Sequence, residues 1–149
     1  MKDFNRYYDF MENFTEFYKK VQQAEYDKFE SLMSNDIERI QKSMQTYHTY
    51  IKQAQQLEHE RIELCKDLGF ENMAFSEVLR HFSGEEKEKL IEQKNRLTGI
   101  VKTIKYLNKK SMDYANMQLS FTADNSAIYN GKGQTDSHLN NSNILDKQI

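Results

Sequence analysis

The sequence predicts an all-α protein: an elongated antiparallel helical bundle, or coiled coil, of three long helices. Three observations lead to this class. The 149 residues include no proline and only five glycines, so long helices can run without interruption. Apolar residues recur at intervals of three and four. Charged residues make up 30% and hydrophobic residues 38%, which is typical of a slender, heavily charged bundle.

The first long helix is expected over about residues 3–33. It holds nine of the 18 Phe and Tyr residues (9 Phe + 9 Tyr), and its main apolar stripe is Phe4, Tyr7, Tyr8, Met11, Phe14, Tyr18, Val21, Phe29 and Leu32. Phe10 and Phe17 widen the apolar face beyond what one antiparallel neighbour normally covers. Two interpretations stay open: a thick aromatic core layer, or an interface with a second copy or another partner.

The second long helix is expected over about residues 36–68. Ser34-Asn35-Asp36 forms a turn in which Asp36 can cap the helix, and Gly69 supplies a C-terminal stop. A short turn between two long helices makes them antiparallel. Glu58 and Arg61 are spaced to pair on one helix face, either as a structural ion pair or with a functional role for Arg61. Cys65 is expected to be a small buried side chain.

A short connecting helix is expected over about residues 75–82, followed by the third long helix over 84–121. The third helix has the most regular pattern of the chain, and we expect the bundle to be organised around it. At 1.5 Å per residue it would be about 55 Å long. Its predicted seam consists of Leu90, Gln93, Leu97, Ile100, Ile104, Leu107, Ser111, Tyr114, Gln118 and Phe121.

Residues 1–121 are therefore expected to form one helical domain, and residues 122–149 a disordered tail. The tail is rich in Asn, Ser, Gly and Asp, and it holds few large apolar side chains that could offset the entropy of ordering it.

Composition also limits the classes of partner and the cellular compartment that the protein can have. A net charge of -2 with interspersed signs leaves no basic footprint for nucleic acid. One cysteine excludes a disulfide framework and fits a reducing compartment. No signal-peptide core and no run of about 20 apolar residues is present. We therefore expect a cytoplasmic protein without membrane insertion.

No catalytic, cofactor-binding or metal-binding site is predicted. His48 and His59 share a helix face but would lie about 16 Å apart, too far to bind one metal ion. Gly131-Lys132-Gly133 lacks the ending of a phosphate-binding loop. No serine or threonine lies in a sequence motif that would place an activating base beside its hydroxyl. The chain is not expected to be an enzyme.

The predicted site is a binding surface at the end of the third helix. This segment is more apolar than one seam requires, and its residues are Met112, Tyr114, Met117, Leu119 and Phe121. Methionine adapts to varied partners, so the surface suits an amphipathic segment docking as a helix in a groove. Core packing is the alternative.

The arrangement resembles the FlgN family of flagellar export chaperones over about residues 14–133. The resemblance is carried by the order and spacing of short motifs: Asn35-Asp36, Leu57 through Arg61 to Leu68-Gly69, Phe75-Ser76-Glu77-Val78-Leu79, Leu107-Asn108, Leu119, Phe121 and Tyr129-Asn130-Gly131-Lys132-Gly133. The chain departs from the family pattern in having Ser111 where a second asparagine often stands, an unusually aromatic first helix and a longer tail.

The resemblance implies a type III secretion chaperone without ATPase activity. Such a chaperone binds the C-terminal segments of the hook-associated proteins FlgK and FlgL, prevents their premature assembly and delivers them to the export gate protein FlhA. By position, the end of the third helix and Ile128 would bind cargo, and Tyr129 would contact the gate. Two alternatives remain: a related chaperone or coiled-coil linker for the filament cap or the export ATPase, and a structural homodimer.

Overall fold

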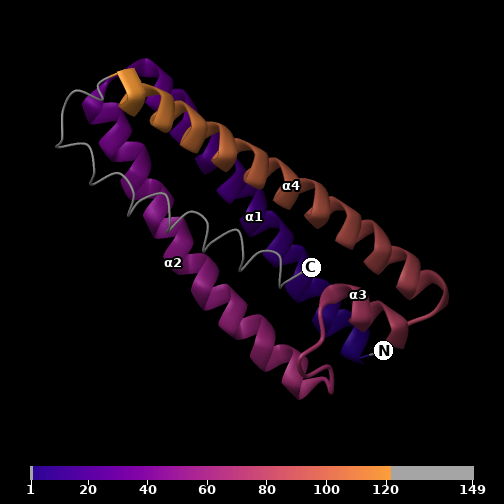
Figure 1. Cartoon of the computed structure of the whole chain (residues 1–149). Coiled ribbons are helices and arrows are strands. Elements are labelled where there is room, and N and C mark those ends of the chain that lie inside the picture. The colour runs from indigo at the N-terminus through magenta and orange to yellow at the C-terminus, as the bar shows by residue number, and fades with distance from the viewer. Residues whose placement is uncertain (1, 122–149) are drawn as a thin grey trace.

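Helix α1 (Lys2–Ser34) lies at the centre of the bundle. The computed structural model describes residues 2–121. Helix α2 (Ile37–Asp67) returns antiparallel along one side of α1, and α4 (Gly84–Phe121) packs along another side (Figure 1). The all-α bundle is confirmed. The expectation that the last helix organises it is wrong, because α2 and α4 both pack closely on α1 and only weakly on each other.

Helices α1 and α4 run parallel to each other. Near their beginnings, Gln93 of α4 donates to Glu12 of α1 at 3.0 Å. Further along, Lys28 of α1 donates to Oδ1 of Asn108 at 3.2 Å. The chain can return in the same direction because the segment after α2 carries it across the end of the bundle. Within residues 2–121, no helix combines the length and apolar character that a bilayer crossing needs.

The aromatic residues of α1 form most of the core. Tyr7 and Phe14 are both 0% exposed, and Phe10 and Phe17 are half-buried against the same cluster. The buried apolar cluster runs along α1 from Phe4 to Val21 and along α4 from Leu90 to Ile104. Of the two interpretations of the aromatic helix, the core layer therefore holds for its first two-thirds. Beyond Val21, the buried positions of α1 are Ala24 and the polar residues Glu25, Lys28 and Ser31.

A short corner closes the end of the bundle that holds the N-terminus of α1, called here the proximal end. It contains α3 (Phe75–Val78) and a 3-10 turn, η1 (Leu79–His81). The ring of Tyr7 meets the rings of Phe70 and Phe75 edge-on, with centroids 6.1 and 5.5 Å apart. These aromatic contacts dock the corner onto α1.

The turns at both ends of α2 follow their local sequence. Asp36 caps the helix, since its Oδ1 accepts from the backbone N–H of Arg39 at 3.2 Å. At the other end Gly69 adopts a φ of +81°. Its N–H donates to the carbonyl of Lys66 at 3.2 Å, and the N–H of Phe70 donates to the carbonyl of Cys65 at 2.7 Å. This is the Schellman pattern of hydrogen bonds, which satisfies the last carbonyls of the helix.

Two glycine-to-alanine substitutions are expected to change stability in opposite directions. Gly69→Ala should lower the free energy of unfolding by about 1 kcal/mol, because a β-carbon is strained at positive φ. Gly99→Ala should raise it by about 0.5–1 kcal/mol, because Gly99 is inside α4 with no atom within 4 Å of an added β-carbon. Urea unfolding of both variants checks this pair. The same sign for both would contradict it.

Candidate functional site

The end of the bundle opposite the corner, called here the distal end, carries most of the exposed apolar surface. Here the C-terminal part of α4 lies beside the turn between α1 and α2 (Figure 1). Ile62 and Ile91 are the large exposed apolar residues toward the proximal end. Those toward the distal end are Tyr26, Met33, Ile37, Tyr106, Met117 and Phe121. Such a concentration is typical of a protein-interaction surface.

One part of this surface lies along the outer edge between α1 and α4, where Phe29 contacts Lys110 and Tyr114. It is called here the distal patch, and its residues are Tyr26, Phe29 and Met33 of α1 with Tyr106, Lys110, Tyr114, Met117 and Phe121 of α4. The Lys110 ammonium lies 5.3 Å from the ring centroid of Phe29 and 5.2 Å from that of Tyr106. The Tyr114 ring meets Phe29 edge-on at 6.5 Å. Phe29 thus joins the two helices across the patch.

The remaining members extend the patch along each helix. Tyr26 and Met33 are seven residues apart on α1, and Phe29 lies between them on the same face. Met117 follows Lys110 by seven residues on α4, and Phe121 follows Met117 by four. Phe121 is 77% exposed, the highest value among the large apolar residues of the bundle. The patch therefore spans several turns of both helices.

The structure separates the predicted binding residues into two groups. Tyr114, Met117 and Phe121 follow one another at intervals of three and four on one side of α4 and belong to the distal patch. Met112 and Leu119 are seven residues apart on a different side of α4, and both are half-buried. The sulfur of Met112 accepts from Nδ2 of Asn108 at 3.8 Å. The five residues predicted on the third helix therefore do not form one surface.

Ile128 and Tyr129 lie outside the described residues. The sequence interpretation also missed the contribution of α1, namely Tyr26, Phe29 and Met33, and missed Tyr106 and Lys110 of α4. The seven-residue spacing of Tyr26 and Met33 was a usable signal. This spacing indicates a shared surface only if α4 lies beside α1 and runs parallel to it, which the sequence does not show.

A basic ridge runs along α4 beside the distal patch. No acidic residue occurs between Glu92 and Asp113. The ridge consists of Lys102, Lys105 and Lys109, spaced three and four residues apart, and it adjoins Lys110 of the patch. Arg96 forms an ion pair with Glu12, whereas Lys102 and Lys109 are exposed. A chain of net charge -2 therefore presents a local positive field next to its apolar surface.

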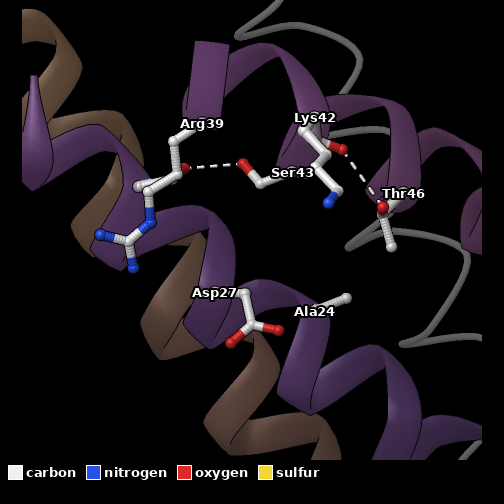
Figure 2. Close-up of a pocket in the computed structure, with 7 residues that line it drawn as sticks. Ala24, Asp27, Arg39, Lys42, Ser43 and Thr46 are labelled. Carbon is white, nitrogen blue, oxygen red and sulfur yellow. Dashed lines mark hydrogen bonds between the residues drawn. The ribbon is translucent and has the colours of Figure 1, made fainter. Parts of the chain in front are cut away.

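A polar cavity of about 250 Å³ lies between α1 and α2, away from the distal patch. Figure 2 shows Asp27 and Ala24 of α1 across from Arg39, Lys42, Ser43 and Thr46 of α2. The Thr46 hydroxyl donates to the carbonyl of Lys42 at 3.1 Å, as the dashed line between these two residues in Figure 2 marks. The Ser43 hydroxyl lies 2.6 Å from that of Ser31. Both hydroxyls are therefore held in structural hydrogen bonds, without a base positioned to activate either as a nucleophile.

The charged groups of this cavity have both signs, and none of them is deeply buried. Asp27 accepts a hydrogen bond from Gln23 at 3.0 Å, and Arg39 lies 3.8 Å from Glu30. Within residues 2–121, no group of three His, Cys, Asp or Glu side chains is placed to bind a metal ion. The cavity is a polar recess between two helices, and the distal patch is the stronger site.

The chain matches a known protein family over most of its length. The family model described as FlgN protein matches residues 1–141 of the 149-residue chain. Neither the curated proteins nor the solved structures include a match to the chain. FlgN proteins are a chaperone family and not a known enzyme family. Because the family model spans nearly the whole sequence, the chain belongs to the FlgN family of flagellar export chaperones.

Proposed function

We propose that this protein is a cytoplasmic chaperone for the hook-associated proteins FlgK and FlgL. It binds their C-terminal amphipathic segments, prevents their premature assembly and delivers them to the export gate protein FlhA. Family membership supports a role in flagellar export in general. The observation that carries the specific proposal is the distal patch, where apolar side chains of two helices stay exposed beside a basic ridge.

The chemistry of the patch suits a segment that folds as it binds. Flexible Met33 and Met117 adapt to the apolar face of a helix, and the aromatic rings offer large contact areas. A disordered segment loses conformational entropy when it folds on the patch, and burial of its apolar side chains offsets this loss. Lys110 and the neighbouring ridge favour a segment with acidic residues along the edge of its apolar face.

Single alanine substitutions in the patch test this proposal. Met117→Ala and Phe121→Ala should each weaken binding of a FlgK or FlgL C-terminal segment by about 1–2 kcal/mol, roughly tenfold in Kd. Calorimetric titration of the full chain with each purified segment measures the change. Both side chains lie on the surface, 47% and 77% exposed, so the helical circular dichroism and the melting temperature should remain close to wild type.

Matched controls come from the proximal half of the bundle. Ile62 and Ile91 are 46% and 39% exposed, close to Met117, yet they lie outside the distal patch. Ile62→Ala and Ile91→Ala should leave both titrations unchanged. If they weaken binding as much as the patch variants do, or if the patch variants bind normally, the assignment of the patch is wrong.

Ile128 and Tyr129 belong to the proposal through the family resemblance alone. We assign Ile128 to cargo binding and Tyr129 to contact with FlhA. Titrating Tyr129→Ala with both partners separates these roles. Cargo affinity should be preserved, while affinity for FlhA should fall. Equal losses for cargo and gate would contradict separate roles.

A homodimer that buries the distal patch is the second candidate, favoured by the same exposed apolar surface. Light scattering of the free chain distinguishes the two functions. A dimer that Phe121→Ala dissociates, with no binding of FlgK or FlgL, would replace the chaperone proposal with a structural one. Retention of a filament cap protein instead of FlgK and FlgL would favour the related chaperone class.

A further inference from the structure

The core of the distal half contains a buried polar cluster that the proposed function has not used. We call it the polar seam; it consists of Glu25 and Lys28 of α1, Tyr47 of α2, and Asn108 and Ser111 of α4. The side chains of Glu25 and Lys28 are each 1% exposed and form an ion pair with Nζ 2.8 Å from Oε2. They occupy the inward positions of α1 directly beyond Val21, where the apolar cluster ends.

Lys28 connects all three long helices at this point. Its ammonium donates to Oδ1 of Asn108 on α4 at 3.2 Å and lies 4.0 Å from the ring centroid of Tyr47 on α2. Few other contacts join α2 to α4. In the distal half a buried cation therefore bridges the three helices at one level, whereas packed aromatic rings hold the proximal half.

The polar seam is incompletely satisfied. Apart from the Lys28 ammonium, no hydrogen-bond donor reaches either carboxylate oxygen of Glu25, and the buried Ser111 hydroxyl has no hydrogen-bond partner. Burial lowers the pKa of Lys28, because the cost of desolvating the ammonium exceeds the attraction of Glu25. Replacing such a pair with apolar residues is often neutral or stabilising, so stability alone does not account for it.

Separation of α4 from α1 at this level would return both charges to water. The desolvation cost of Glu25 and Lys28 would be recovered, which offsets part of the lost apolar contact. Along the chain, the corner at the proximal end connects α2 to α4, and the buried apolar cluster includes no residue of α4 beyond Ile104. The part of α4 from Leu107 onward can therefore move without disrupting the aromatic core.

We propose that residues 107–121 of α4 form an arm that detaches from α1 at the polar seam, and that this opening admits the partner segment. Detachment exposes the inner face of the arm, including Leu107, which is 5% exposed in the closed bundle. Opening breaks the contacts of Phe29 with Lys110 and Tyr114, so the arm presents its inner face together with its own exposed patch residues, Met117 and Phe121. The role of the opening in binding rests on the proposed function, whereas the opening itself does not.

Hydrogen exchange of the free full-length chain tests the opening without any partner. Amides of residues 107–114 should exchange at least 100-fold faster than those of residues 93–104 in the same helix. Residues 115–121 are left out of the comparison because helix ends fray. Equal protection of the two segments would overturn the proposal.

Apolar replacement of the ion pair should close the arm. In the double variant Glu25→Leu, Lys28→Met, exchange of residues 107–114 should slow at least tenfold relative to residues 93–104. Binding of the FlgK and FlgL segments should weaken at least fivefold. Ser111→Ala removes the unpartnered hydroxyl with little disturbance and should slow the same amides about threefold, which keeps a test available if the double variant misfolds.

The matched control is an exposed ion pair of the same spacing on the same helix. Nζ of Lys19 lies 3.0 Å from Oε1 of Glu16, and both side chains are about half exposed. Glu16→Leu, Lys19→Met should leave the exchange of residues 107–114 unchanged. If neither Ser111→Ala nor the folded double variant slows these amides, the seam does not control the arm.

The titrations distinguish failure of this inference from failure of the proposed function. If the arm exchanges fast in wild type and slows in the variants, but no FlgK or FlgL segment binds wild type, the opening stands and the proposed cargo is wrong. If wild type and the closed variant bind these segments equally well, the proposed function stands and opening is not the admitting step.

Discussion

Replacing Tyr7 with alanine should lower the free energy of unfolding by about 3–5 kcal/mol, as expected for deletion of a fully buried aromatic side chain. Tyr7 is 0% exposed, and its ring meets Phe70 and Phe75 of the corner. The substitution leaves a cavity at the junction of α1 with the corner. Urea unfolding followed by circular dichroism measures the loss.

Tyr7→Phe is the matched control for this prediction. The Tyr7 hydroxyl is buried without a hydrogen-bond partner, and burial raises its pKa well above the ordinary value. Removing the hydroxyl while keeping the ring should therefore raise the free energy of unfolding by up to about 1 kcal/mol. If the phenylalanine variant were destabilised as much as the alanine variant, the hydroxyl would have to be engaged in the folded protein.

Replacing Arg61 with alanine should cost about 3 kcal/mol. The guanidinium binds both carboxylate oxygens of Glu58, each at 2.9 Å, and donates to the backbone carbonyl of Met73 at 3.4 Å. The substitution leaves Glu58 unpaired with a side chain only 18% exposed, and it removes a link from α2 to the corner. Loss of one partner of a buried pair costs about 3–5 kcal/mol. Because Glu58 is partly exposed and keeps some of its hydration, we expect a loss at the lower end of this range.

An exposed arginine on the same helix provides the control. Arg39 lies 3.8 Å from Glu30, and both side chains are about half exposed. Arg39→Ala should therefore cost about 0.5 kcal/mol or less in the same urea titration. Similar losses for Arg39→Ala and Arg61→Ala would show that burial does not determine the value of these pairs.

Local features of the chain were readable from the sequence because their causes are local. Asp36 caps α2 through its own side chain, and Gly69 ends that helix because it can adopt positive φ. The pairing of Glu58 with Arg61 needs only their spacing on one helix, and it is confirmed. The burial of Cys65 is also confirmed.

The candidate site was only partly predictable. The sequence indicated an apolar surface at the end of the last helix, but it could not show that Met112 and Leu119 lie away from the other members. It also gave no indication that Phe29 completes the patch. One feature of the sequence indicated the polar seam: the apolar stripe of α1 is interrupted for eight residues between Val21 and Phe29. Glu25 and Lys28 fall within that interval.

The sequence by itself determined the all-α class, the long uninterrupted helices, and the residues that start and stop α2, because hydrophobic periodicity, capping and glycine conformation act within a few residues of the chain. Only the tertiary structure decided that α1 is central, that α4 runs parallel to it, and that Lys28 is buried between three helices. These facts depend on which helix faces meet and in which register, and residues 80 positions apart must be brought together before their side chains can select one arrangement.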